Sequence, residues 1–141
     1  MIKSNITVEI KANRKMVWDC ITDNQNYAWR SDISKIETKG EEQFVEYTKT
    51  NFPTFFTITK KEPLFLYEFD MQNANLTGHW TGKLTTLSDD VTQIELIEEV
   101  EVRNPIMRLL TKSYLKKQQK QYIQDLQREI KTREEGKKNE I

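Results

Sequence analysis

Residues 76–110 read LTGHWTGKLTTLSDDVTQIELIEEVEVRNPIMRLL. This stretch predicts two long strands, the turn between them and the start of a helix. Apolar residues and glycines alternate with polar residues from 76 to 84, the period of a strand with one buried face. Residues 88–90 (SDD) predict a turn, and alternation resumes from 91 to 102. Asn104-Pro105 then indicates a helix start, because Asn caps helices and Pro suits the first helical position.

Strand patterns also fill the sequence before this stretch. From about residue 34 onward we expect six strands with short turns, including 44–48, 54–59 and 65–71. Such spacing is typical of an antiparallel meander. Gly78 and Gly82 lie inside a strand pattern and predict a bend or bulge.

A long helix is expected after Pro105, with apolar residues at helical spacing as far as Ile130. Its apolar stripe changes sides: Met107, Leu110 and Tyr114 lie roughly opposite the later apolar residues at 100° per residue. Residues 133–141 (REEGKKNEI) are expected to form a charged flexible tail.

The N-terminal part predicts a strand at 5–11 and a helix capped by Asn13, followed by a second short helix or a loop near Trp29. The sequence therefore predicts one α+β domain over residues 1–132. We expect a curved antiparallel sheet of about seven strands wrapped around the long C-terminal helix, with two short helices after the first strand. The long helix is the only element large enough to cover the buried face of the sheet.

Composition argues against several classes of partner. The 22 basic and 22 acidic residues give no net charge, so no overall field attracts nucleic acid or an anionic membrane. No apolar run approaches the ~20 residues of a membrane span, so we expect no stable membrane insertion. The N-terminus does not resemble a signal peptide, and we expect a cytoplasmic protein. One cysteine and one histidine predict neither a disulfide nor a metal site, and no cofactor is expected.

At the level of motifs the chain resembles the SRPBCC superfamily, the START-like helix-grip proteins that include polyketide cyclases. The residues that carry the resemblance, over roughly 3–130, are Val17-Trp18-Asp19, Asp23, Trp29-Arg30, Tyr67-Glu68-Phe69, Gly78-His79-Trp80, Glu98-Glu99-Val100 and Asn104-Pro105. The resemblance implies an elongated cavity between the sheet and the C-terminal helix that takes apolar ligands. It implies no shared catalytic residues, and we assign none.

Strand and helix parity predicts the residues that face the interior. We expect ligand-contacting side chains from four strands and the first half of the long helix: Phe56, Ile58, Tyr67, Phe69, Met71, Trp80, Leu96, Glu98, Met107, Leu110 and Tyr114. The family resemblance adds Trp29 and Arg30 at the cavity mouth, where Arg30 can meet a ligand carboxylate. The alternatives are that these side chains simply fill a close-packed core, and that Trp29 plugs one end of it.

Three polar residues are candidates for chemistry. Parity places Glu98 on the apolar face, where burial raises the pKa of a carboxyl. A bulge near 97–99 would instead turn it outward, and a salt bridge would neutralise it. His79 has the opposite parity to Trp80 and is expected on the outer face, whereas Cys20 is expected to be a buried apolar residue.

Three classes of function remain open. The first is binding or transport of a small hydrophobic molecule such as a lipid, polyketide or aromatic compound. The second is a cyclase or dehydratase that holds the same kind of molecule while Glu98 or a tyrosine moves a proton. The third is a protein-interaction module or homo-oligomer that uses the later half of the helix and the tail.

Overall fold

The computed structural model describes residues 1–139 and has an α+β architecture. Seven strands and two helices occur within those residues. In chain order they are β1 (Ile2–Ile10), α1 (Arg14–Thr22), β2 (Ile33–Lys39), β3 (Gln43–Thr48), β4 (Pro53–Glu62), β5 (Leu66–Gln72), β6 (Leu76–Ser88), β7 (Val91–Val102) and α2 (Pro105–Asn139).

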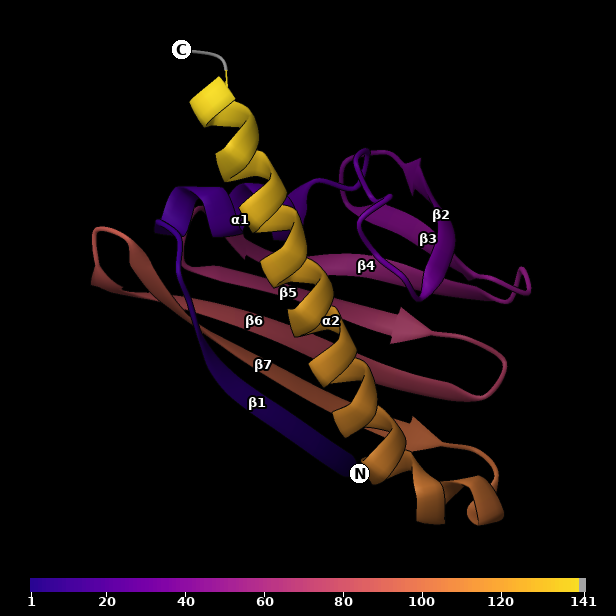
Figure 1. Ribbon diagram of the computed structural model, residues 1–141. Coiled ribbons are helices and arrows are strands. Elements are labelled where there is room, and N and C mark those ends of the chain that lie inside the picture. The colour runs from indigo at the N-terminus through magenta and orange to yellow at the C-terminus, as the bar shows by residue number, and fades with distance from the viewer. Residues whose placement is uncertain (140–141) are drawn as a thin grey trace.

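The strands form one antiparallel sheet in the order β1-β7-β6-β5-β4-β3-β2. Strands β2 to β7 pair with their neighbours in sequence, and β1 adds to the free edge of β7. Helix α2 crosses one face of the sheet and packs chiefly against β1 and β7 and against α1 (Figure 1). The predicted sheet and long helix are therefore confirmed.

Both helix starts carry the predicted caps. The side-chain oxygen of Asn13 accepts a hydrogen bond from the backbone amide of Met16 (2.9 Å), and that of Asn104 accepts one from the amide of Ile106 (2.8 Å). These bonds satisfy amides that have no partner inside the helix.

The second short helix is not formed, and a loop runs from residue 23 to residue 32. The carboxylate of Asp23 accepts hydrogen bonds from the amides of Gln25 (2.9 Å) and Asn26 (3.3 Å). A carboxylate that caps local amides in this way favours a turn over a continued helix. The two short helices expected after the first strand are therefore a single helix and a turn-rich loop.

Helix α2 continues to Asn139, so most of the segment expected as a tail is helical. Arg133 and Glu129 form an ion pair one turn apart (2.9 Å), which supports helix in the charged region. Residues 140 and 141 lie outside the described residues. No helix in the described chain is long and apolar enough to cross a membrane.

One stripe of α2 is buried against the sheet. Leu115, Ile123, Leu126 and Ile130 are at most 5% exposed. Gln119 lies on the same stripe and is also buried, since its side-chain amide donates to the Ser4 carbonyl (3.0 Å) and accepts from the Ser4 hydroxyl (2.9 Å). The polar middle of the helix is therefore docked on β1 by hydrogen bonds.

On the opposite face of the sheet, His79 lies between two carboxylates, as its parity predicts. Its Nδ1 is 2.7 Å from Asp70 and its Nε2 is 2.8 Å from Glu68. Burial alone would lower the pKa of His79, but these two carboxylates outweigh it and raise the pKa. A histidine with a raised pKa stabilises the fold fully below its unfolded pKa and loses that contribution as pH rises through its folded pKa.

We therefore expect a His79→Gln variant to lose more stability relative to the wild type at pH 6 than at pH 9. Urea unfolding at the two pH values measures the difference. An equal loss at both would mean that the imidazolium contributes nothing through its charge.

Candidate functional site

A cavity of about 450 Å³ lies between the sheet, the 23–32 loop and the first half of α2. This volume is in the range of small-molecule sites. The cavity is lined by Ile21, Asn24, Arg30, Asp32, Ile33, Phe44, Glu46, Thr48, Phe52, Thr54, Phe56, Tyr67, Phe69, Met71, Asn73, Asn75, Leu76, Trp80, Glu98, Val100, Val102, Met107, Leu110, Thr111, Tyr114, Leu115, Gln118 and Tyr122. The interior is thus an open cavity on the β3–β6 side of the sheet, where α2 does not press on the strands.

One wall of the cavity is aromatic because the strand register places rings side by side. Phe44 pairs with Phe56 across β3 and β4, and their rings stack at 4.8 Å. Phe69 pairs with Trp80 across β5 and β6, and those rings stack at 4.6 Å. The Tyr67 ring meets Phe69 edge-on, and its buried hydroxyl has no hydrogen-bond partner among the described residues.

The two glycines of β6 permit close approach and do not mark a bulge. The register between β6 and β7 is continuous at both, and shifts only between Thr86 and Ser88. A Cβ on Gly82 would lie 2.8 Å from the Trp80 ring, and one on Gly78 would lie 2.7 Å from the Glu99 carbonyl oxygen. Gly82 therefore lets the indole lie flat over its own strand.

Glu98 faces the cavity from β7. It pairs with Trp80 on one side and with Ser4 on the other, and the unbroken register with β1 excludes the outward-turning bulge. Burial and the neighbouring Glu46 together raise the pKa of Glu98 from 4.5 to about 7, against the opposing effect of Arg30. No described residue forms a hydrogen bond or ion pair with its carboxylate, so Glu98 has unused capacity toward the cavity.

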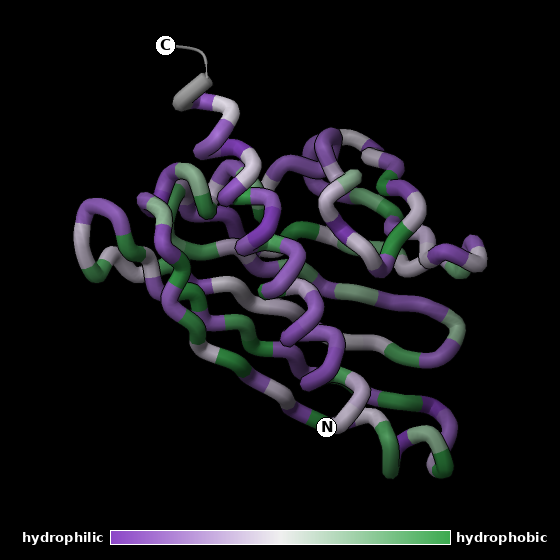
Figure 2. The backbone as a smooth tube through the Cα atoms, in the orientation of Figure 1, coloured by the Kyte–Doolittle hydropathy of each residue, from purple (hydrophilic) through white to green (hydrophobic). Residues whose placement is uncertain are grey.

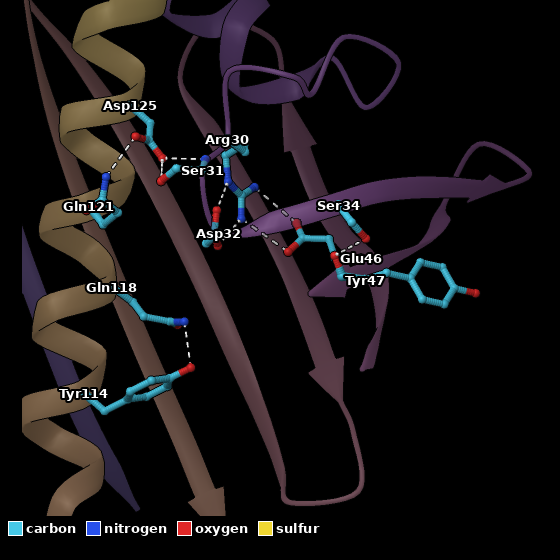
Figure 3. Close-up of polar contacts among 10 residues, drawn as sticks. All are labelled: Arg30, Ser31, Asp32, Ser34, Glu46, Tyr47, Tyr114, Gln118, Gln121 and Asp125. Carbon is cyan, nitrogen blue, oxygen red and sulfur yellow. Dashed lines mark hydrogen bonds and ion pairs between the residues drawn. The ribbon is translucent and has the colours of Figure 1, made fainter. Parts of the chain in front are cut away.

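Arg30 lies beside the cavity in a charge cluster (Figure 3). Its guanidinium donates to both oxygens of Asp32 (2.9 and 3.0 Å) and to Glu46 (3.3 Å). Burial alone would lower the pKa of Arg30, but Glu46 and Asp32 raise it, so the group stays charged. Two carboxylates already hold this guanidinium, which leaves little reason for it to bind a third from a ligand.

The loop that carries Arg30 is tied to α2 through Asp125 (Figure 3). This carboxylate is fully buried and accepts hydrogen bonds from the amide (2.9 Å) and hydroxyl (2.8 Å) of Ser31. Gln121 (2.9 Å) and Arg128 (3.0 Å) donate to its other oxygen. Arg128 also donates to the Trp29 carbonyl (3.2 Å), so two side chains of the helix hold the loop over the cavity, and Asp125 is the buried one.

The helix lines the cavity with a different stripe from the predicted one. Thr111 and Leu115 line it as buried residues and Tyr122 as a half-buried one, whereas Gln118 lines it but is exposed. Met107, Leu110 and Tyr114 border the cavity but are 44%, 71% and 55% exposed, so they form its open rim. The physical reason is that the helix starts beyond the sheet, and Thr111 is its first buried residue.

Ten of the thirteen predicted residues line the cavity. Trp29, Ile58 and Leu96 do not. Leu96 is buried in the core, and Ile58 and Trp29 pack against that core as partly buried residues. The Trp29 ring meets the Tyr122 ring edge-on.

The sequence reasoning missed several lining residues, notably Phe44, Glu46 and Tyr122. Alternation along β3 could have found the first two, because Phe44, Glu46 and Thr48 share one face and all line the cavity. Tyr122 belongs to the stripe that was assigned to the opposite side of the helix.

The described residues do not favour a metal site or a cysteine nucleophile. They contain no cluster of three or more His, Cys, Asp or Glu side chains that could hold a metal ion. Burial raises the pKa of Cys20 to about 11, which keeps it a thiol and a poor nucleophile at neutral pH.

No protein-family model and no curated protein matches this sequence. Solved structures do match. A START superfamily protein from Mycobacterium smegmatis is similar with a TM-score of 0.83 and 13% identity, over 92% of this chain and 97% of that one. The Zhui aromatase/cyclase from a Streptomyces species has a TM-score of 0.81 and 13% identity, over 93% and 94%. A conserved protein from Geobacillus kaustophilus has a TM-score of 0.80 and 17% identity, over 93% and 96%. The chain thus has the START-like helix-grip fold.

Proposed function

We propose that this chain binds an uncharged hydrophobic small molecule in the cavity between its sheet and α2. The observation that carries the proposal is an aromatic-walled space of about 450 Å³ with one unpaired carboxyl, Glu98, inside it. Burial of a ligand against the rings supplies affinity, and a hydrogen bond to Glu98 supplies orientation. The fold, which is shared with START and aromatase/cyclase structures, is consistent with this use.

The charges around the cavity argue for a ligand without negative charge. Arg30 is the cation of the cluster, and it faces the two carboxylates of Asp32 and Glu46. Glu98 adds a further negative charge whenever it is ionised. A ligand carboxylate would therefore enter a site that is already negative, whereas a hydroxyl or carbonyl group can hydrogen-bond to protonated Glu98 without that repulsion.

The first test is native mass spectrometry of the protein purified from its source cells, compared with the denatured mass. We expect an extra mass that is lost on denaturation. In parallel, a thermal-shift panel of neutral naphthols, long-chain alcohols and fatty acids should show stabilisation by neutral compounds and less by the acids. The absence of both an extra mass and any stabilisation would overturn the proposal.

Two substitutions on the same strand locate the binding. Leu76 lines the cavity, whereas Leu87 is 47% exposed near the far end of β6 and lies outside the lining. Leu76→Trp should fill part of the cavity and abolish the stabilisation by 1-naphthol. Leu87→Trp adds the same volume elsewhere and should leave that stabilisation unchanged. Equal behaviour of the two variants would place binding outside the cavity.

A second candidate function is favoured by the same carboxyl. A glutamate with a pKa near 7 in an apolar cavity can donate and accept protons at neutral pH, as a cyclase or dehydratase requires. Incubating the co-purified ligand with the wild type and with Glu98→Gln separates the two functions. Conversion by the wild type alone, with binding kept in both, supports the enzyme; retention of unchanged ligand by both supports a carrier.

A further inference from the structure

The first turns of α2 carry an apolar surface that no residue in the described part of the chain (1–139) covers. Every residue from 103 to 110 is exposed. Ile106, Leu109 and Leu110 are 76%, 85% and 71% exposed, and Met107 is 44% exposed. We call these four residues the apolar tip. In Figure 1 this start of α2 projects past the strands, and Figure 2 shows hydrophobic segments gathered there. An exposed cluster of this kind marks an interaction site more often than an ordinary surface.

The charge next to the tip has one sign. From Arg103 to Gln124 the chain has six basic residues and no acidic one. At 100° per residue, Lys117 and Lys120 fall on the same outward face of α2 as Ile106 and Leu109. Glu101, the nearest acidic residue before the segment, is paired with the N-terminal amine (3.2 Å). The zero net charge of the whole chain therefore conceals a local cationic face.

These two properties select one partner among the candidates. A second copy of the chain offers the same positive face and no complementary negative one, so charge complementarity does not favour a tip-to-tip dimer. An anionic lipid surface satisfies both properties, because its interface accepts exposed Ile, Leu and Met side chains and its headgroups attract Lys and Arg.

We propose that the apolar tip and the basic face behind it dock this protein on the surface of an anionic lipid bilayer. The docking is peripheral: the tip enters the headgroup region and the sheet stays in water. Met107 and Leu110 belong both to the tip and to the rim of the cavity. A docked molecule therefore turns the open side of its cavity toward the bilayer. This last point rests on the proposed function, since it provides a route by which a hydrophobic ligand can enter from the membrane without crossing water.

Vesicle flotation of the full chain tests the docking. We expect the protein to float with vesicles of three parts phosphatidylcholine to one part phosphatidylglycerol at low salt, and to dissociate as salt is added. Pure phosphatidylcholine vesicles should bind it much more weakly. Ile106→Ser/Leu109→Ser, at two exposed positions outside the cavity lining, should weaken binding by about tenfold or more. Lys117→Glu/Lys120→Glu should weaken vesicle binding by about fivefold or more for each lysine replaced.

Matched controls lie elsewhere on the surface. Leu87→Ser changes an exposed leucine near the far end of β6, and Lys39→Glu changes an exposed lysine at the end of β2. Both should float like the wild type. Failure of the wild type to float at low salt, or equal flotation by the tip variants, would overturn the docking. So would a dimer in analytical ultracentrifugation that the tip variants abolish without any vesicle binding by the wild type.

The ligand-binding proposal and the membrane-docking proposal are tested by separate measurements. Stabilisation by 1-naphthol is measured without vesicles, and the Ile106→Ser/Leu109→Ser variant should retain it. If the protein does not float with vesicles but 1-naphthol still stabilises it, only the docking proposal is contradicted. Flotation by a protein that no neutral compound stabilises would instead leave the docking intact and remove the proposed function.

Discussion

Replacing Asp125 by alanine is expected to lower the free energy of unfolding by about 3 kcal/mol. The side chain is fully buried and accepts four hydrogen bonds, two of them from Ser31 of the 23–32 loop. Removing it breaks the bonds from the Ser31 amide and hydroxyl and leaves Gln121 and Arg128 without their acceptor, and hydrogen bonds to a charged group are worth more than neutral ones. Chemical unfolding at pH 7 measures the loss.

Arg128→Ala is the matched control for Asp125→Ala. Arg128 donates to the same carboxylate, but its side chain is 61% exposed, so we expect a loss of less than about 1 kcal/mol.

Burial alone would raise the pKa of Asp125, but the bonds from Ser31, Gln121 and Arg128 outweigh it and lower the pKa. A carboxyl with a lowered pKa contributes fully above its unfolded pKa and loses that contribution as pH falls through its folded pKa. The difference in free energy of unfolding between Asp125→Ala and the wild type should therefore have its full size at pH 7 and become smaller in strong acid. A loss independent of pH would identify a packing defect instead.

The strands were predictable because each has one buried and one exposed face. Alternation from 76 to 84 and from 91 to 102 sets parity, and parity places Trp80 and Glu98 inside and His79 outside without any knowledge of the fold. Local signals also placed both helix starts, because a cap is a bond between neighbours in sequence.

The helix was harder to predict because its buried stripe is partly polar. Gln119 and Asp125 lie in the interface with the sheet and loop, where Ser4 and Ser31 satisfy their hydrogen bonds. A prediction from apolar periodicity assigns such polar residues to the solvent-exposed face. It therefore assigns the cavity-facing stripe to the apolar residues at the start of the helix, which are exposed. Partners 94 or 115 residues away are a tertiary property that no local pattern contains.

Whether the interior is filled or open also depends on tertiary placement. The rings of Phe44, Phe56, Phe69 and Trp80 are compatible with either arrangement, since a row of rings on a sheet can pack against a helix or against a ligand. The outcome depends on α2, which packs chiefly on β1 and β7 and meets Trp80 of the aromatic wall through the ring of Tyr122.

Replacing Glu98 by glutamine is expected to raise the free energy of unfolding at pH 8.5 by about 3–4 kcal/mol. Glu98 has a pKa of about 7 in the fold against an ordinary value of 4.5, and each pH unit of difference corresponds to about 1.4 kcal/mol. Because the pKa is raised, the folded state prefers the protonated form. The penalty is absent below pH 4.5, grows as the carboxyl ionises, and is complete above pH 7. Glutamine has nearly the same shape and no charge, so it removes the penalty. Urea unfolding from pH 4.5 to pH 8.5 should show the two proteins diverging as pH rises.

A penalty of this kind links stability to the proposed function. Leucine or glutamine at position 98 would make a more stable protein, so an unpaired carboxyl in this cavity is best explained by an interaction that appears only with a ligand. The wild type should then bind 1-tetralone, a ketone that can only accept a hydrogen bond, less tightly as pH rises through 7, since ionised Glu98 can no longer donate one. Glu98→Gln keeps a donor at every pH and should bind 1-tetralone equally at pH 6 and pH 8.5. Glu62→Gln, on an exposed glutamate at the end of β4, should leave both the stability profile and the binding profile unchanged. If Glu98→Gln also leaves both profiles unchanged, water solvates the carboxylate in the cavity and its role as an anchor is lost, although the aromatic wall could still bind a hydrophobic molecule.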